Sequence, residues 1–396
     1  MIRRAFPSLL IPLALLAPAI GIPGCDEKKG DEASVVAPSC KRLNTCDWSV
    51  HFVTEPGGRD NGLQDVACPA PSRCIAVGSQ WQASRGFAEE WDGGEWKPIA
   101  AVDSVLKAIS CPTPTWCMAV GNNPPGTWSL QREAAGGDAK WAIRPFAPPV
   151  SQKWTELLLN DVSCLSRTIC TAAGNFHEVG YENYAARWDG RKWKLEHPPN
   201  PKDEIAGPTH GMLGVSCPSP DFCVTVGAFK LLPLIEHWDG RKWEIVAAPH
   251  PKGSPSASLE SVFCTSESSC MAVGNATVGR VIGPFAERWD GSRWSVVPTP
   301  RSNRKGTGIL SSVSCPANSF CAAVGGVALP GETETTIAMT WDGRRWIRRP
   351  SPDPKPFTQL AGVSCPSRRY CMAVGEAGPD WGAGTPLAAK LTKPGT

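Results

Sequence analysis

The stretch MLGVSCPSPDFCVTVG, residues 212–227, and the stretch WDGRKW, residues 238–243, decide the fold because both recur along the chain. The first has the form Leu-x-x-Val-Ser-Cys, five residues, then Cys-x-Ala-Val-Gly. Internal repeats of about this length are typical of solenoids and propellers. Seven copies start 43 to 53 residues apart, at 63–78, 106–121, 159–174, 212–227, 259–274, 310–325 and 360–375.

The second element, Trp-Asp-Gly-x-x-Trp, closes five copies, and the chain ends where the seventh copy should carry it. The second copy has a degenerate form ending at Trp141. Ahead of the first copy, Cys46-Asp47-Trp48-SVHFVTEP looks like the segment that follows each second tryptophan. A repeat split between the two termini favours a closed ring, in which the N-terminal strand completes the last sheet. We therefore predict an all-β fold, a seven-bladed β-propeller of four-stranded antiparallel blades over residues 40–396.

Each blade is expected to contain four strands, named a to d in chain order. Strand a is LxxVSC, strand b is CxAVG, strand c ends at the first tryptophan, and strand d starts at the second. Small and β-branched residues on both faces suit sheets that pack against neighbouring blades. Gly and Pro, 39 residues each, fit short strands joined by turns, and no apolar pattern of helical period persists through them.

Each copy holds one cysteine pair with five residues between the partners. Strand ends joined by such a loop face each other at a distance that suits a disulfide. A metal site needs ligands that converge, so we predict disulfides and no metal or cofactor. The predicted pairs are Cys68–Cys74, Cys111–Cys117, Cys164–Cys170, Cys217–Cys223, Cys264–Cys270, Cys315–Cys321 and Cys365–Cys371, with Cys40–Cys46 as an eighth.

The WDGxxW stretch is interpreted as a turn rather than a site. Asp-Gly favours a tight hairpin because glycine accepts positive φ and aspartate bonds to nearby backbone. The stretch resembles the Asp-box of bacterial sialidases and related propellers, with one residue fewer between Asp and Gly. The chain resembles secreted bacterial repeat propellers with Asp-box or kelch-like blades. In the sialidases the box lies at the periphery, so the resemblance implies no catalytic residue here.

The N-terminus is typical of an exported protein. Residues 1–24 combine a basic start with an apolar segment, and Ile22-Pro23-Gly24-Cys25 resembles a bacterial lipobox. We expect lipid on Cys25 and a flexible tether over residues 25–39, with simple secretion as the alternative. The many cysteines agree with an oxidising compartment outside the cytosol.

The loop lengths place function on one face of the predicted ring. The a–b and c–d connections share one face and are uniform in length. The b–c and d–a connections share the other, where 10 to 15 residues separate the strand-b glycine from the first tryptophan of the regular copies. Because binding residues favour variable loops on a rigid scaffold, we expect long loops and a binding site there. The candidate ligand-binding residues are His177, Glu178, Tyr181, Tyr184, His210 and His250.

The function predicted from the sequence is non-enzymatic. Net charge is +3 without a long run of one sign, which does not favour nucleic acid as a partner. No nucleophile elbow, phosphate-binding loop or zinc-protease helix is present, and no catalytic residue is assigned. We expect a monomer, anchored at the envelope or secreted, that binds a protein or a glycan. A glycan-active hydrolase or lyase on the same face and an envelope assembly factor remain alternatives.

Overall fold

The computed structural model describes residues 48–53, 61–80, 84–123, 126–135, 138–145, 157–178, 180–199, 211–300, 306–329, 333–380 and 383–391. The chain divides into two units, residues 1–32 and 33–396, and every strand lies in the second. The expected signal peptide, Cys25, the tether and the Cys40–Cys46 pair lie outside the described residues. Among the residues that are described, none forms a helix long and apolar enough to cross a membrane.

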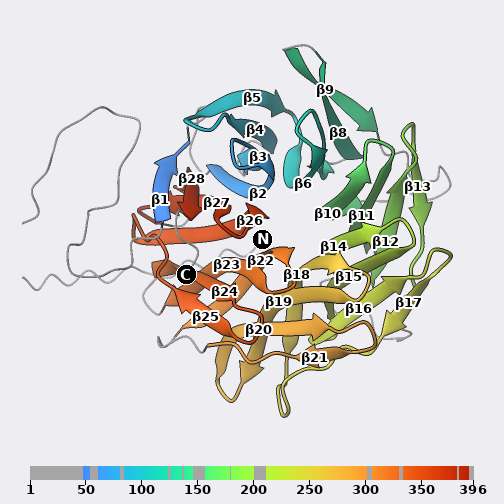
Figure 1. Ribbon diagram of the computed structural model, residues 1–396, viewed down its shortest axis with the longest axis vertical. Helices are drawn as coiled ribbons and strands as arrows, with labels where there is room; N and C mark the ends of the chain where they lie inside the picture. The colour runs from blue at the N-terminus through green and yellow to red at the C-terminus, as the bar shows by residue number, and fades with distance from the viewer. Residues whose placement is uncertain are drawn as a thin grey trace, which may run out of the picture. The chain divides into compact units, whose positions relative to one another are not determined.

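The described residues form 28 strands, four for each copy of the repeat, as the all-β prediction requires (Figure 1). The a strands are β2 (Asn61–Ala70), β6 (Val105–Thr113), β10 (Leu157–Ser166), β14 (Gly211–Ser219), β18 (Ala257–Ser266), β22 (Thr307–Ala317) and β26 (Phe357–Ser367). The b strands are β3 (Arg73–Gln80), β7 (Trp116–Asn123), β11 (Ile169–Glu178), β15 (Phe222–Phe229), β19 (Ser269–Val278), β23 (Phe320–Leu329) and β27 (Tyr370–Gly378).

The outer half of each repeat is a second antiparallel hairpin. The c strands are β4 (Arg85–Trp91), β8 (Gly126–Ala135), β12 (Gly180–Trp188), β16 (Leu232–Trp238), β20 (Val281–Trp289), β24 (Thr333–Trp341) and β28 (Thr385–Leu391). The d strands are β5 (Trp96–Val102), β9 (Asp138–Pro145), β13 (Trp193–Glu196), β17 (Trp243–Val246), β21 (Trp294–Val296), β25 (Trp346–Arg349) and β1 (Trp48–Phe52).

Five sheets have four strands in the order a, b, c, d. An eight-stranded sheet joins the strands of the sixth and seventh repeats through one parallel bridge, Glu334 to Phe357. In the seventh repeat β1 supplies the fourth strand. It pairs antiparallel with β28, and Trp48 opposes Leu391 as Trp243 opposes Trp238 in the fourth repeat.

The hydrophobic core lies between neighbouring sheets. Buried side chains form clusters that each combine two adjacent repeats, because small and β-branched residues leave both faces of every sheet apolar. One of these clusters joins Leu63 and Trp91 of the first repeat to Met372 and Ala388 of the last. The a strands lie nearest the common centre of the second unit, and each contacts the a strand of the next repeat (Figure 1). The architecture is that of a repeat β-propeller.

Candidate binding site

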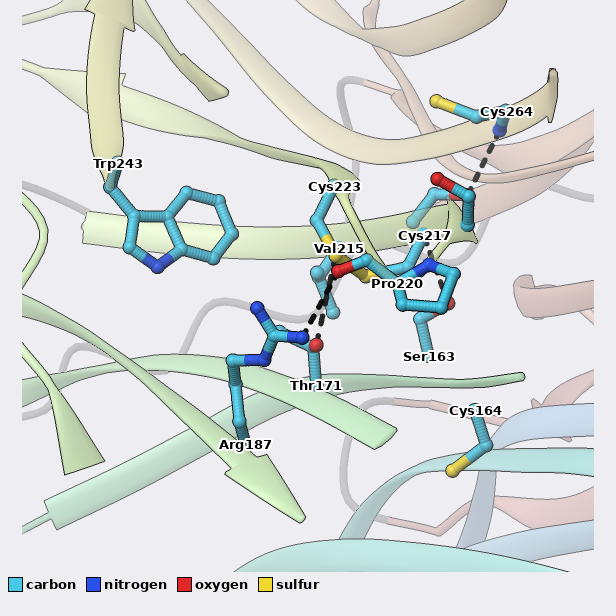
Figure 2. Close-up of a disulfide and its surroundings, with 12 residues drawn as sticks. Ser163, Cys164, Thr171, Arg187, Val215, Cys217, Pro220, Cys223, Trp243 and Cys264 are labelled. Atoms are coloured by element: carbon cyan, nitrogen blue, oxygen red, sulfur yellow. Dashed lines mark hydrogen bonds between the residues drawn. A yellow bond between two sulfur atoms is a disulfide. The ribbon is translucent and has the colours of Figure 1, made fainter. Parts of the chain in front are cut away.

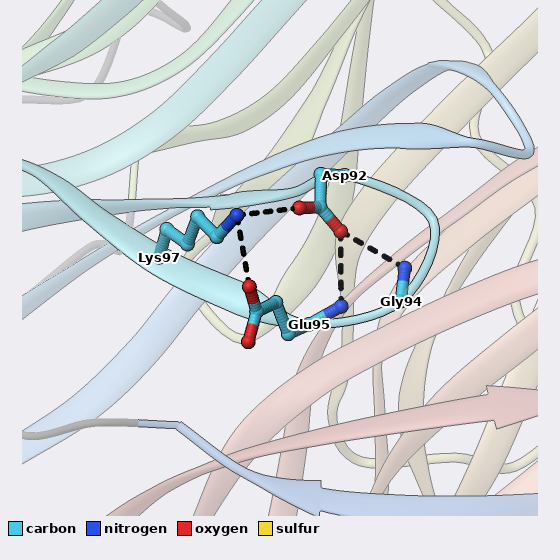
Figure 3. Close-up of polar contacts among 4 residues, drawn as sticks. All are labelled: Asp92, Gly94, Glu95 and Lys97. Carbon is cyan, nitrogen blue, oxygen red and sulfur yellow. Dashed lines mark hydrogen bonds and ion pairs between the residues drawn. The ribbon is translucent and has the colours of Figure 1, made fainter.

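The WDGxxW stretches form the turns between the c and d strands, as predicted. In the first repeat, Asp92 Oδ1 accepts hydrogen bonds of 3.0 Å from the backbone N–H groups of Gly94 and Glu95 (Figure 3). Lys97 Nζ bridges the Asp92 and Glu95 carboxylates at 2.8 Å each. Gly93 has a φ of +103°, which a residue with a side chain adopts only with strain. These bonds, with Lys97 the largest cause, hold the pKa of Asp92 well below its usual range.

The c–d turn lies beside the a–b turn of the same repeat. In the third repeat, Trp188 Nε1 donates to the carbonyl of Arg167 in the a–b turn, at 3.2 Å. The two tryptophan rings of the turn lie with their centroids 5.6 Å apart. The turns thus form a repeated, rigid end of the strands, which we call the turn end. Its polar groups are used to hold the scaffold.

All seven disulfides predicted within the repeats are present. Each joins the end of strand a to the start of strand b, so each stiffens one hairpin. The Cys217–Cys223 bridge lies close to Arg187 of the preceding repeat, whose guanidinium donates to Pro220 O at 3.0 Å (Figure 2).

A hydrogen bond from the serine of the Val-Ser-Cys motif joins neighbouring repeats. Ser163 Oγ accepts the backbone N–H of Cys217 at 3.0 Å, one repeat further along the chain (Figure 2). The same bond forms at 2.9–3.0 Å wherever the motif has serine. The two repeats without this serine have Ala67 or Phe263 in its place. The serine therefore fixes the spacing of adjacent a strands rather than serving a site.

The two variable positions of the Leu-x-x-Val motif shape the centre. In every a strand the pairing with strand b shifts at the first x, which is a β-bulge. The bulge turns that side chain towards the centre, where it is half-buried. The seven residues at this position are Gln64, Lys107, Asn160, Leu213, Glu260, Ser311 and Ala361. They line a central pocket of about 370 Å³.

Where the second x residue is polar, it holds the neighbouring a strand. Asp65 Oδ2 accepts the N–H of Ile109, and Asp161 Oδ2 accepts that of Val215, both at 2.8 Å. Where this residue is Gly362, the adjacent strand fills the space, since a Cβ there would lie 2.8 Å from the Cα of Asp65. The first x residue thus lines the pocket in every repeat, and the polar second x residues both line it and bond the neighbouring strand.

Burial changes the acid–base properties of the pocket. It raises the pKa of Asp65 to about 7, although the N–H groups of Ile109 and Val66 act in the opposite direction. It raises the pKa of Asp161 to about 8, with a further increase from the charge of Asp65. Burial also lowers the pKa of Lys107. Burial therefore disfavours the ionised forms of these three groups.

The pocket lies towards the end of the strands opposite the turn end. Gln64 is the fourth residue of β2, whereas the a–b turn follows Ala70. Gln359 and Glu376 of the last repeat also line it. They pair with each other across β26 and β27, one step beyond the pair formed by Leu360 and Gly375. We call this end, where the b–c and d–a connections lie, the pocket end. A wider hollow of about 600 Å³ at the turn end, between Phe222, Ser268 and Trp289, is lined by scaffold residues.

The structure corrects the expectation of long b–c loops. Strands b and c extend towards the tip of their hairpin, so that Glu178 pairs with Gly180 and Phe229 pairs with Leu232. Most residues assigned to loops from the sequence therefore belong to regular strands. Their side chains alternate between faces, which restricts how many can reach a common site.

Tyr184 is not a surface residue, which corrects its assignment as a ligand-binding residue. It is fully buried on β12 and packs over Gly174, where a Cβ would lie 2.9 Å from its hydroxyl. The position four residues before the first tryptophan faces the strand-b glycine in each regular copy. A comparison of copies could have shown this, because the equivalent residues are all apolar: Phe87, Leu234, Phe285 and Ile337.

The other candidates are placed as follows. His177, Glu178 and Tyr181 lie on the β11–β12 hairpin, where the structure describes the backbone alone. His250 is exposed in the connection between β17 and β18, and His210 lies outside the described residues. The pocket residues were missed because LxxVSC was interpreted only as a strand. Their signal was the variability of the x positions within a strand that otherwise hardly changes.

No family model matches the chain, and no curated protein matches it. Solved structures that it resembles include Sqt1 from Chaetomium thermophilum bound to the N-terminus of ribosomal protein L10, at 14% identity over 80% of this chain and 83% of that one, with a TM-score of 0.45. U3-55K shares 9% identity over 72% and 95%, with a TM-score of 0.42. A putative TolB from Agrobacterium tumefaciens shares 10% over 74% and 89%, with a TM-score of 0.43. At such values the description of the fold rests on this chain's own strand pairing.

Proposed function

We propose that this chain is a non-enzymatic binding protein of the cell envelope, built as a closed, seven-bladed β-propeller. Its partner is a protein, which it holds over the pocket end. The contrast between the two ends of the strands carries this proposal. The turn end repeats the same disulfides and turns, whereas the first x residue differs among the repeats and points into the central pocket.

Three observations support closure of the ring. The a strand of the last repeat, β26, contacts that of the first, β2. Ser364 Oγ accepts the N–H of Cys68, the same bond that joins consecutive repeats. Strand β1 completes the last set of four strands. A ring closed in this way leaves as sheet edges only the a strands at the centre and the short d strands at the rim.

The chemistry of the pocket favours a protein partner over a glycan. The lining residues are amides, hydroxyls, carboxyls, one ammonium and aliphatic groups, with no aromatic ring among them. Glycan sites typically stack a sugar ring on an aromatic side chain. Amides, hydroxyls and carboxyls instead suit the polar side chains and backbone of a peptide segment. His177, Glu178, Tyr181, His210 and His250 are proposed as further contacts of the same partner at the rim.

Export is part of the proposal. Seven disulfides in one chain suit an oxidising compartment. Removal of residues 1–24 and lipid attachment at Cys25 would leave the second unit on a tether at the membrane. Mass spectrometry of the mature N-terminus tests both steps, and an intact residue 1 in the exported protein would contradict them.

A cross-linking pull-down from envelope extracts tests the function, using residues 33–396, the compact unit that contains every strand. We expect a protein partner whose binding weakens about tenfold in the pocket variants Gln64→Ala and Glu260→Gln. Arg241→Ala at the turn end is the control. Equal binding by all three variants would place the partner elsewhere, and binding only on a glycan array would refute the protein partner.

A further inference from the structure

Aliphatic side chains are exposed at the tips of two b–c hairpins of the pocket end. The described residues include six large exposed hydrophobic side chains, and four belong to these tips. Leu231 and Leu232 lie at the β15–β16 tip and are 61% and 41% exposed. Val278 and Val281 flank the β19–β20 turn and are 47% and 49% exposed. We call these four residues the aliphatic tip patch.

The two hairpins are held side by side by backbone hydrogen bonds to consecutive residues. The N–H of Ala257 donates to Leu231 O at 2.7 Å, and the N–H of Thr277 donates to Ser256 O at 2.8 Å. Both tips are therefore fixed to the same segment at the start of β18. The patch therefore lies on two hairpins, of the fourth and fifth repeats, that are bonded to one shared segment.

The backbone of the first tip is strained. Phe229 pairs with Leu232 across a two-residue turn, in which Lys230 and Leu231 have φ of +47° and +67°. Such turns favour Asn or Gly, because a side chain is unfavourable at positive φ. The neighbouring tip has Gly279 at +67°. Leu231 thus occupies a position where glycine would be more stable, and strained residues of this kind are frequent at functional sites.

Positive charge surrounds the patch. Lys230 and Arg280 lie in the two turns, and Lys252 lies in the adjacent connection between β17 and β18, all three exposed. Neither Asp nor Glu occurs in the segments around the tips, residues 227–235, 247–259 and 275–286. The charged side chains of these segments are therefore all cationic. Aliphatic groups ringed by cations complement a surface that has anionic groups above a hydrocarbon layer.

We propose that the aliphatic tip patch inserts into the surface of an anionic lipid bilayer. Protein interfaces are usually anchored by aromatic residues in well-packed pockets, and neither is found among the four patch residues. Turn residues of two hairpins can enter a lipid surface without a loss of backbone freedom, because backbone hydrogen bonds already hold the hairpins in place. The contact is separate from the central pocket and does not depend on the partner proposed for it.

Vesicle flotation of residues 33–396 tests this inference. We expect binding to phosphatidylcholine vesicles containing about a third phosphatidylglycerol, and binding about a hundredfold weaker to phosphatidylcholine alone, because three cations near an anionic surface each contribute about fivefold. The double variant Leu231→Ser/Val281→Ser should bind the anionic vesicles about tenfold more weakly. Lys230→Gln/Arg280→Gln should reduce the preference for anionic vesicles to about fivefold, the contribution of Lys252.

A matched control is available in the same repeats. Ile245 on β17 and Val296 on β21 are exposed aliphatic residues of the outer strands, 42% and 38% exposed. Ile245→Ser/Val296→Ser should bind vesicles like the parent. Leu231→Gly is a second test variant, because glycine accepts the positive φ at this position and should keep the fold. It should still weaken binding to the vesicles.

Three results would overturn the inference. The first is a parent that does not float with anionic vesicles, and the second is a tip variant that floats as well as the control. The third is a protein captured by the parent and lost from the tip variant without any vesicle binding, which would assign the patch to a protein.

Discussion

Ser364 Oγ accepts a hydrogen bond from the backbone N–H of Cys68, 2.9 Å away and 296 residues earlier in the chain. The bond joins the last repeat to the first with the geometry used between consecutive repeats. We expect Ser364→Ala to lower the free energy of unfolding by about 1 kcal/mol, because a backbone donor between two sheets loses its acceptor. Denaturant unfolding measures the change. Ser72→Ala, in an exposed a–b turn, is the control, and equal effects would contradict the role of Ser364.

The position of Ala67 offers the reverse experiment. In the first repeat Ala67 replaces the serine of the Val-Ser-Cys motif, so the bond towards Cys111 of the next repeat has no side-chain acceptor. We expect Ala67→Ser to raise the free energy of unfolding by about 0.5–1 kcal/mol. The same denaturant titration checks it. A neutral or destabilising result would show that the neighbouring strands need the smaller residue.

The turn at Asp92 contains two adjacent glycines in different conformations. Gly93 has a φ of +103°, whereas a Cβ on Gly94 would meet only Asp92 Oδ1, at an ordinary 3.6 Å. We expect Gly93→Ala to lower stability by about 1 kcal/mol through backbone strain, and Gly94→Ala to have little effect. Thermal unfolding of the two variants decides this. Equal melting temperatures would disprove the strain.

Glu287 gives stability a dependence on pH. It is fully buried on β20, and burial raises the pKa of its carboxyl from 4.5 to about 9. An acid with a raised pKa in the folded state contributes stability that is fully present below the unfolded pKa and is lost as pH rises through the folded pKa. The parent should therefore lose stability between about pH 4.5 and 9.

Glu287→Gln should reduce that loss by a few kcal/mol at most, on the order of what burial of one ionised carboxyl costs. The two proteins should be similar in stability near pH 4, where the glutamate is neutral in both states. Urea titrations at several pH values measure the difference, with the exposed Glu95→Gln as control. A constant difference across pH would contradict the assignment to Glu287.

Removal of one disulfide should have a local, limited effect. Cys217→Ala/Cys223→Ala opens a short loop within one hairpin, so we expect a loss of about 2 kcal/mol or less, with the fold retained. Circular dichroism and thermal unfolding check this. Complete unfolding would show that the bridge does more than stiffen its hairpin, and non-reducing peptide mapping should find every bond within a repeat.

The sequence predicted the features that repeat. Cysteine spacing located the disulfides, and Asp-Gly between tryptophans located the c–d turns, because both depend on contacts within a few residues. Four strands for each repeat followed from the same spacing. Such local rules are independent of how the sheets pack against each other.

The features that depend on packing could not be predicted in the same way. Tyr184 was expected at the surface because it was assigned to a long b–c loop, but the register of β11 and β12 places it over Gly174 in the core. The bulge at Gln64 is a shift in the pairing of β2 with β3 that the motif did not indicate, so the pocket was not foreseen. The strained Leu231 turn contradicts turn propensities, and only the backbone angles reveal it.

The bulge also makes the centre of this protein modular. Because the first x residue leaves the strand ladder, its side chain differs from repeat to repeat while the pairing of strands a and b stays the same. Variation in evolution, or a library made in the laboratory, could alter recognition at these positions while the repeated disulfides, turns and strand pairing stay the same. Seven copies of one repeat thus enclose an asymmetric pocket, because each copy contributes a different first x residue to it.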